Sequence, residues 1–266
     1  MRDNGRGTLR ALAVLRALNV ENDTTVLRLS AMTEISRQAL YRILETLVAE
    51  GYVARHPESG RYQLTNLVRA LSEGFKDEQW IGEIAGLELE KLQRKVVWPT
   101  EMAICQNFTM QLILSTRRHS PFVIDYGNVG VVLPVLRTAL GIAYLAHCPK
   151  PERDLTLRFY REQGPSLDGD LARNKTRIAR ILSATKTRGF ATRHRNVFSG
   201  IAYPDIFDTN ATIAVPIMVG GGAVASIGIT YIAAAMTTAV ALERYLRPLQ
   251  ATARTISRLA AEKRRI

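Results

Sequence analysis

The most regular pattern of hydrophobic and polar positions lies in residues 36–53, SRQALYRILETLVAEGYV. Its apolar residues recur at helical spacing on one face: Leu40, Ile43, Leu44, Leu47 and Val48. Ser36 is a favourable N-cap and Gly51 a favourable residue just after a helix end, so the pattern predicts one helix between them. The polar residues of this helix are then expected to face solvent.

Shorter patterns on both sides of this helix predict a small DNA-binding domain, residues 1–64. Two helices are predicted before it, at residues 8–18 and 25–32. Two short strands are predicted after it, at residues 52–56 and 61–64, joined by a turn that contains glycine. Three helices followed by a two-stranded wing are typical of a winged helix-turn-helix, whose last helix enters the major groove of DNA.

The exposed face of the third helix has side chains that can recognise base edges. Those predicted to meet base edges are Arg37, Gln38, Tyr41 and Arg42, because arginine can pair with guanine and glutamine with adenine. Those predicted to hold phosphates are Ser36, Arg55 and Arg61. Any amphipathic surface helix has a polar outer face, and some winged helices bind protein, but the caps, wing and arginines together favour DNA.

The formal charge of +12 is compatible with binding nucleic acid, but it does not locate the part that binds. Residues 1–76 contain 11 basic and 8 acidic residues, a net charge of +3. The rest of the chain contains 25 basic and 16 acidic residues, a net charge of +9. The two parts are about equally basic per residue. The helices and the wing, rather than the charge, therefore predict DNA binding.

The rest of the chain predicts a linker helix at residues 65–77 and a second domain at residues 78–266. This domain begins with a helix at residues 80–96 and ends with a long helix that starts near Thr237. The strands predicted between them are residues 100–105, 111–116, 122–126, 129–134, 190–194, 209–219 and 223–232. The helices predicted between them are residues 138–147, 152–163 and 170–187. This order predicts an α+β fold with a mainly antiparallel sheet.

Patterns typical of catalysis are missing from the sequence. His56, His119, His147 and His194 lack the spacing of a metal site, and the two cysteines have no neighbouring partner. Ser199 lies outside a GxSxG motif. We therefore expect no enzymatic activity, no cofactor and no metal, in a protein of the reduced cytoplasm. No apolar segment approaches the roughly 20 residues of a membrane span, so no membrane partner is expected.

The string LPVLRTALG, residues 133–141, predicts a strand that ends at Pro134 and a helix that begins near Thr138. Free backbone N–H groups at this helix start, with Arg137 and Thr138 beside them, would attract an anion such as a carboxylate. An ordinary strand-to-helix connection has the same pattern, so the residues by themselves support both interpretations.

Several strings resemble the IclR family of bacterial transcription regulators. RALAVLRAL, SRQALYRILETLVAEGYVAR and GRYQLT are similar to its winged-helix motif, and LPVLRTALG is similar to its effector-domain helix motif. ATIAVPIMVGGGAVASIGITY is similar to its closing hairpin. Within the family, LSEGFKDEQWI, VVWPTE, IAVPI and AAAMT resemble the MhpR-like regulators of 3-(3-hydroxyphenyl)propionate catabolism. The resemblance covers nearly the whole chain.

The resemblance implies a GAF-like effector-binding domain, assembly of the chain into dimers or tetramers, and an organic acid as effector. The residues at the positions of the family's pocket are Leu133, Thr138, Ala139, Thr212, Gly228 and Thr230, with either Asp205 or Asp208 as its acid. Gly228 stands where the closing strand often has serine. The missing side chain is expected to open space that suits an aromatic ring better than a small acid such as glyoxylate.

We therefore expect a ligand-responsive transcription regulator of an aromatic-acid catabolic operon, which binds a palindromic operator as a dimer. An aromatic carboxylate would bind the second domain and change either DNA occupancy or the recruitment of RNA polymerase. The linker helix is expected to differ between the two states. The alternatives are a regulator of the same type that senses a small aliphatic acid, an enzyme with an appended helix-turn-helix, and a nucleoid protein with little sequence preference.

Overall fold

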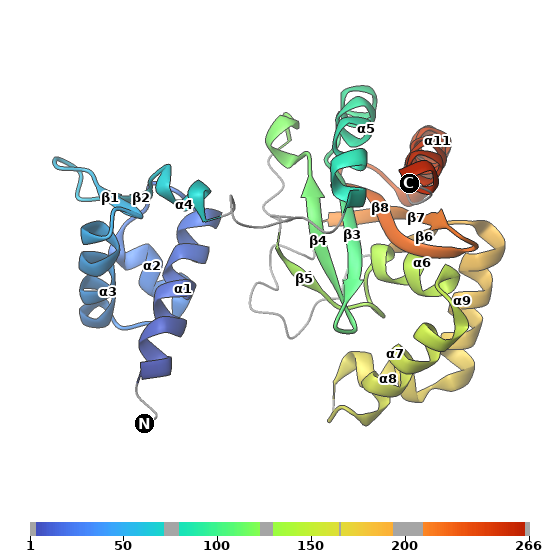
Figure 1. Cartoon of the computed structure of the whole chain (residues 1–266), viewed down its shortest axis with the longest axis horizontal. Helices are drawn as coiled ribbons and strands as arrows, with labels where there is room; N and C mark the ends of the chain where they lie inside the picture. The colour runs from blue at the N-terminus through green and yellow to red at the C-terminus, as the bar shows by residue number, and fades with distance from the viewer. Residues whose placement is uncertain (1–3, 72–79, 123–129, 165, 194–209, 264–266) are drawn as a thin grey trace. The chain divides into compact units, whose positions relative to one another are not determined.

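The computed structural model describes residues 4–71, 80–122, 130–164, 166–193 and 210–263, which belong to two compact units (Figure 1). The first unit spans Met1–Glu78 and the second spans Gln79–Ile266. Each unit has a hydrophobic core of its own. Separate cores are what two independently packed domains require.

The first unit is a winged helix-turn-helix, as the sequence predicts. Its elements are α1 (Asn4–Val20), α2 (Val26–Thr33), α3 (Arg37–Ala49), β1 (Val53–Arg55) and β2 (Tyr62–Leu64). The two strands pair antiparallel, and the three helices pack around buried side chains that include Leu18, Leu29, Leu40 and Leu44. Tyr62 of the wing is buried in the same core, so the wing is fastened to the helices.

Local capping fixes the helix ends at the turn between α2 and α3. The Thr25 hydroxyl accepts a hydrogen bond from the Arg28 N–H at 3.3 Å, and the Ser36 hydroxyl accepts one from the Ala39 N–H at 3.4 Å. Glu34 ends α2 with a left-handed φ of 57°, which turns the chain sharply. The caps predicted at Thr25 and Ser36 are therefore confirmed.

One prediction for this unit is wrong, and another concerns residues that lie mainly outside the described part of the chain. Val48 is 38% exposed rather than buried, because its position lies about 80° around the helix from Leu40. The predicted linker helix is represented by α4 (Leu67–Ala70), and Leu71 already lies in a turn. The remainder of the predicted linker falls mainly on residues 72–79, outside the described part of the chain.

The second unit is built on an antiparallel sheet with the strand order β5-β4-β3-β8-β7-β6 among the described residues. The strands are β3 (Thr100–Gln106), β4 (Thr109–Ser115), β5 (Val132–Leu133), β6 (Ala191–Arg193), β7 (Asn210–Val219) and β8 (Gly222–Ile232). The long hairpin of β7 and β8 lies inside the sheet, between β3 and the edge strand β6. The predicted α+β class with a mainly antiparallel sheet is confirmed.

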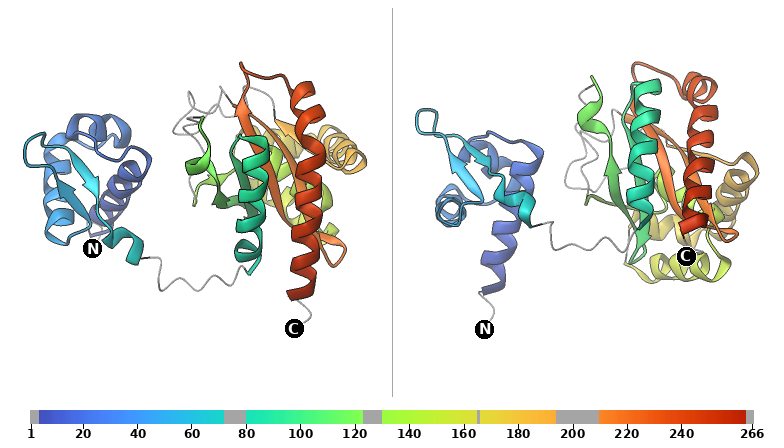
Figure 2. Two further views of the ribbon diagram at one scale, coloured as in Figure 1. Left: turned by 90° about the horizontal axis from the view of Figure 1, so that it is seen from above. Right: turned by 45° about the horizontal axis from the view of Figure 1, so that its top comes forward.

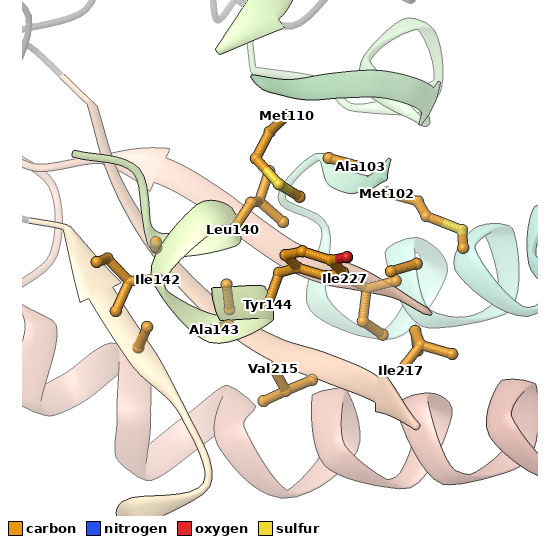
Figure 3. Close-up of a cluster of buried hydrophobic side chains, with 14 of the residues drawn as sticks. Met102, Ala103, Met110, Leu140, Ile142, Ala143, Tyr144, Val215, Ile217 and Ile227 are labelled. Atoms are coloured by element: carbon orange, nitrogen blue, oxygen red, sulfur yellow. The ribbon is translucent and has the colours of Figure 1, made fainter. Parts of the chain in front are cut away.

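Helices cover both faces of this sheet (Figures 1 and 2). One face holds α5 (Trp80–Val96) and α11 (Thr238–Lys263), and the other holds α6 (Ala139–His147). In the described part of this unit, the remaining helices are α7 (Lys150–Glu162), α8 (Leu167–Arg173), α9 (Lys175–Arg188) and the short 3₁₀ helix η1 (Arg117–His119). Figure 3 shows part of the core, with Leu140 and Tyr144 of α6 and with Val215 and Ile227 of the sheet. Because both faces are covered there, both alternating sets of side chains are mostly buried in β7 and β8.

The structure differs from the predicted elements at two further places. The helix predicted at residues 170–187 is divided, because the Asn174 side chain accepts a hydrogen bond from the Arg177 N–H at 3.0 Å and caps α9. The strand predicted at residues 129–134 is reduced to β5. The strand predicted at residues 122–126 falls mainly on residues that the structure does not describe.

The start of α6 lies against the chain segment that precedes it. A Cβ atom added to Gly141 would lie 2.1 Å from the Val135 carbonyl oxygen, which no real side chain can do. Glycine at this position therefore allows the helix to begin in direct contact with the backbone of the β5–α6 connection. This contact fixes the position of the α6 N-terminus.

We predict that Gly141→Ala destabilises the second unit by about 3 kcal/mol or more, because backbone atoms must move to relieve the clash. Gly86→Ala on α5 is the matched control, since no described atom lies within 4 Å of the added Cβ. That exchange should stabilise the unit by about 0.5–1 kcal/mol, because alanine favours a helix. Urea unfolding followed by circular dichroism measures both changes. Similar effects of the two exchanges would contradict the proposed contact.

Candidate functional site

The first candidate site is the solvent-facing side of α3. The four residues predicted to meet base edges are all exposed: Arg37, Gln38, Tyr41 and Arg42. Neither of the two arginines forms an ion pair with a described residue, so both guanidinium groups can contact DNA. Ser36, predicted to hold a phosphate, caps the end of the helix where these side chains begin. The structure therefore brings these residues together on one helix surface.

The two arginines of the wing have different surroundings. Arg55 is exposed, and its guanidinium carbon lies 5.8 Å from the centre of the Tyr62 ring. Arg61 donates hydrogen bonds to the Asp23 carbonyl oxygen at 2.7 and 3.0 Å and lies 3.3 Å from the Asp23 carboxylate. Arg61 therefore joins the wing to the α1–α2 connection, and Arg55 is better suited to a phosphate contact.

The second candidate site is a polar patch on the face of the sheet that packs against α6. Strand pairing sets Thr230, Thr212 and Arg193 opposite one another on three neighbouring strands. Glu101 pairs with Gly228 in the next row on the same face. Because directly paired residues point to the same side of a sheet, these five residues form one patch, called here the sheet patch.

Hydrogen bonds connect the hydroxyl groups of the sheet patch with a buried carboxyl group. The Thr212 and Thr230 hydroxyl oxygens are 3.1 Å apart, and the Thr230 hydroxyl donates to Glu101 Oε2 at 3.1 Å. Oε1 of Glu101 has no partner among the described residues. Burial raises the pKa of Glu101 from 4.5 to about 7, while the Thr230 hydrogen bond and the charges of Arg193 and Arg117 act in the opposite direction.

The N-terminus of α6 supplies backbone donors. The Thr138 hydroxyl accepts a hydrogen bond from the Gly141 N–H at 3.0 Å and donates one to the Pro134 carbonyl at 2.8 Å, so the fold itself uses this group. Ala139 and Leu140 are the first residues of the helix, and their N–H groups have no acceptor within it. These N–H groups, rather than the Thr138 hydroxyl, are suited to an anion.

Arg137 is held in place by an internal ion pair. Its Nε lies 2.9 Å from Asp168 Oδ2, and the two side chains are only 14% and 10% exposed. Burial raises the pKa of Asp168, and the neighbouring Arg137 acts in the opposite direction. Oδ1 of Asp168 has no partner in the described part of the chain. Arg137, which was predicted to attract a carboxylate, therefore already has a carboxylate partner.

A groove of about 770 Å³ lies between the start of α6, helices α8 and α9, and strand β6. We call it the α6–α9 groove. Its basic side chains are Arg137, Arg177, Arg188 and Arg193, and its apolar side chains include Leu136, Ile142 and Ile181. A volume of this size can hold a small organic molecule. Cationic side chains beside apolar surface suit an organic anion.

The predicted effector residues are divided between this groove and the sheet patch. Arg137 and Thr138 line the groove, whereas Thr212, Gly228 and Thr230 belong to the patch. Leu133 and Ala139 are buried in the core. Asp205 and Asp208 lie outside the residues that the structure describes. Arg193 belongs to both features, so it connects the groove with the patch.

The space expected at Gly228 is filled. A Cβ atom there would lie 3.2 Å from Leu140 Cδ2, 3.2 Å from Thr212 Cγ2 and 3.1 Å from the Ile213 carbonyl oxygen. Protein interiors are close-packed, so neighbouring groups occupy the volume that a missing side chain leaves. The expectation that Gly228 opens room for a ring is therefore wrong, and the α6–α9 groove supplies the larger space.

Three buried charged residues of the site were not predicted: Glu101, Asp168 and Arg193. Glu101 could have been found, because a carboxyl group inside an apolar strand is unusual in a sheet that is covered on both faces. The other two give no comparable signal. Their partners Arg137 and Asn210 lie 31 and 17 residues away along the chain, and only the folded structure brings them together.

The cysteines lack the properties of activated nucleophiles. Both are free, and burial raises the pKa of the Cys105 thiol to about 11 and that of Cys148 to about 12. Both groups are therefore protonated at neutral pH, whereas a catalytic cysteine needs a thiolate. Among the described residues, no cluster of three or more potential metal ligands occurs. None of the helices in this part of the chain has the length and apolar character of a membrane span.

Comparison with known proteins finds a family similarity for the first unit. Residues 7–57 match the model of the IclR helix-turn-helix domain, a range that contains most of α1, all of α2 and α3, and the first strand of the wing. The first unit is therefore similar to IclR helix-turn-helix domains. The transcriptional regulator XynR of Escherichia coli is 24% identical over 192 residues, which are 68% of this chain and 71% of XynR.

Solved structures of IclR proteins share the fold of the whole chain. The IclR protein of Thermotoga maritima has a TM-score of 0.65 at 20% identity, covering 96% of this chain and 98% of that one. An IclR homologue of Microbacterium hydrocarbonoxydans, solved with 4-hydroxybenzoate, has a TM-score of 0.60 at 20% identity, covering 94% and 97%. These two structures show the fold that the chain shares, and the relative XynR is described as a transcriptional regulator.

The pKa of Glu101 predicts how the stability of the second unit depends on pH. The folded state keeps the Glu101 proton up to about pH 7 and the unfolded state loses it near pH 4.5. Stability from this group is therefore present below pH 4.5 and is lost as pH rises through about 7. We predict that Glu101→Gln gains up to about 3 kcal/mol over the wild type across this interval, because glutamine stays neutral.

Urea unfolding at several pH values measures this difference. Glu243→Gln is the control, because it makes the same exchange at an exposed position on α11 instead of a buried one. Its stability difference from the wild type gives the effect of removing one negative charge at an exposed position. A stability difference for Glu101→Gln that does not change with pH would contradict the raised pKa.

Proposed function

We propose that this protein regulates an aromatic-acid catabolic operon, binding a palindromic operator as a dimer and an aromatic carboxylate in its second unit. The observation that supports it most directly is the α6–α9 groove, where apolar surface and four arginines meet beside the N-terminus of α6. The exposed face of α3 supplies the DNA-binding half of the proposal.

The DNA-binding part of the proposal assigns base contacts to α3 and a phosphate contact to the wing. The exposed Gln38 amide and the two exposed guanidinium groups of α3 have the donors and acceptors that base edges require. Arg55 supplies a phosphate contact, which adds affinity without sequence information. Because one recognition helix reads only a few base pairs, a dimer on a palindrome gives the specificity that a regulator needs.

The effector half rests on an exchange of partners at Arg137. A ligand carboxylate can replace Asp168 on the Arg137 guanidinium and accept hydrogen bonds from the N-terminus of α6. Its ring then covers Leu136, Ile142 and Ile181. The 4-hydroxybenzoate held by the Microbacterium homologue supports an aromatic acid as the class of effector, because that protein shares this fold.

The ligand can regulate transcription only if it binds one arrangement of the DNA-binding domains better than another. Release of Asp168 changes the contacts of α8, whose N-terminal half contains this residue. We infer that this change reaches the linker and alters either DNA occupancy or the recruitment of RNA polymerase. Dimers and tetramers both provide the paired domains that such a change requires.

For DNA, we predict that Gln38→Ala lowers the preference for the selected operator over random DNA by about 1–3 kcal/mol. The operator is first selected from a pool of random duplexes with the wild-type protein. Competition binding then gives the affinity ratio for each variant. Arg55→Ala is the control, because loss of a phosphate contact should weaken binding to both kinds of DNA equally. Equal losses on both kinds of DNA for Gln38→Ala would refute its base-reading role.

For the effector, we predict opposite results for two variants of the ion pair. Asp168→Asn removes the competing carboxylate, so aromatic acids should bind as tightly as to the wild type or more tightly. Arg137→Gln/Asp168→Asn removes both charges without leaving Asp168 unpaired, and it should weaken binding about tenfold or more. Calorimetric titration with 4-hydroxybenzoate and 3-(3-hydroxyphenyl)propionate measures both.

Glyoxylate and pyruvate serve as small aliphatic acids in the same titrations. Tighter binding of these acids than of the aromatic ones would replace the aromatic effector with an aliphatic one. Equal affinity of the wild type and the double variant for every acid would remove Arg137 from the site. Conversion of any of these acids by the protein would contradict a purely regulatory function.

A further inference from the structure

The second unit has a strongly basic segment around α9. Residues 171–193 contain seven basic side chains and no acidic one: Arg173, Lys175, Arg177, Arg180, Lys186, Arg188 and Arg193. Two of these cations lie in the first turn of α9, where the positive end of the helix dipole favours acidic residues instead. Asp170 pairs with Arg173 at 2.6 Å, and an anion bound near the start of α9 would offset the unfavourable charge of the other cations there.

Part of this charge faces a second groove. The α7–α9 groove has a volume of about 410 Å³, and Lys175 and Lys186 of α9 line one wall. Arg153 and Arg161 of α7 line the other wall. The two lysines are separated by eleven residues, or about three helical turns, so they lie on the same side of α9 about 16 Å apart. Cations from two helices therefore follow one continuous surface.

The protein itself neutralises these cations only slightly. Asp154 is the one acidic side chain among the described residues that line the α7–α9 groove, and it forms an ion pair with Lys150 at 2.5 Å. Lys175 and Lys186 are exposed and form no ion pair with any residue that the structure describes. Their charges are available to a partner.

We propose that the α7–α9 groove is a second DNA contact, which binds the phosphate backbone of the duplex beside the operator. This inference rests on the DNA binding proposed for α3. Once that domain holds a duplex, the second unit is tethered near the same DNA and meets a high local concentration of phosphates. A contact that would be weak in isolation then adds to the affinity.

The surface chemistry of α9 favours DNA over an acidic protein. The exposed residues next to the lysines are small or polar, namely Thr176, Ala179, Ser183 and Thr187. Stable protein interfaces rely on aromatic or large apolar residues at their centre, and this stretch of α9 offers none on its exposed side. Cations accompanied by hydroxyl groups are what a sugar–phosphate backbone requires.

The test compares Lys175→Gln/Lys186→Gln with the wild-type full chain on a mixed-sequence duplex of about 60 base pairs. Fluorescence anisotropy at several KCl concentrations gives the slope of log K against log[KCl]. Each lost phosphate contact reduces this slope by about 0.9, so the double variant should have a slope shallower by about 2 for each protomer that contacts the duplex. Its affinity at low salt should fall severalfold.

Arg247→Gln/Arg254→Gln is the matched control. These two exposed arginines of α11 belong to the helix that covers the opposite face of the sheet, and their exchange removes the same net charge. The control should keep the wild-type slope. Equal slopes for the wild type and both variants would overturn the proposed contact.

Two other outcomes separate failure of the groove assignment from failure of the DNA-binding function. If the groove variant keeps the wild-type slope on DNA but loses its effect on transcription by purified RNA polymerase, the groove binds an acidic protein and the DNA assignment is wrong. If the wild-type protein binds no duplex, the DNA-binding function proposed above is wrong, and the groove proposal falls with it.

Discussion

In the second unit, α6 begins in contact with the backbone of Val135. Gly141 allows this close approach, because a Cβ atom there would clash with the Val135 carbonyl oxygen. The contact sets the α6 N-terminus beside Arg137 and Thr138 and above the sheet patch. The cap formed by Thr138 and the groove that ends at β6 both depend on it. A shift of the helix by even the width of a methyl group would separate the backbone donors from the polar side chains.

Covering the sheet on both faces has an electrostatic consequence. The polar side chains of the sheet patch cannot exchange hydrogen bonds with bulk water, so each must find a partner within the fold or bear a cost. Thr212 and Thr230 satisfy one another and one oxygen of Glu101. The remaining oxygen of Glu101 has no described partner, and burial holds that carboxyl group partly protonated near neutral pH. The sheet patch thus contains a carboxyl group that is partly protonated near neutral pH and has one oxygen without a described partner.

The sequence predicts the first unit well because the signals there are local. Helical spacing in α3, the caps at Thr25 and Ser36, and the wing all act within a few residues, and tertiary packing agrees with them. Val48 is the exception, because its position at the edge of the apolar face was resolved only by the packing of the other helices. The break at Asn174 escaped prediction because an asparagine within a helical pattern does not reveal that it caps a new helix.

The site in the second unit depends on contacts that the sequence does not encode locally. Glu101 and Thr230 are 129 residues apart, and the strand order that joins them becomes known only with the sheet topology. The resemblance supplied positions for a pocket. It did not show that Asp168 already forms an ion pair with Arg137 or that Leu140 fills the space at Gly228. Both facts arise from close packing between elements that lie far apart in the chain.

The internal pair of Arg137 and Asp168 also bears on which acid the proposed site would select. A ligand carboxylate that replaces Asp168 exchanges one charge-assisted hydrogen bond for another, so this step contributes little net free energy. The affinity must then come mainly from apolar surface, and a buried aromatic ring can contribute about 3 kcal/mol. An acid of the size of glyoxylate has almost no such surface to offer to Leu136 and Ile142. The same ion pair that competes for the carboxylate therefore favours effectors with a ring, because only they can offset the loss of the internal partner.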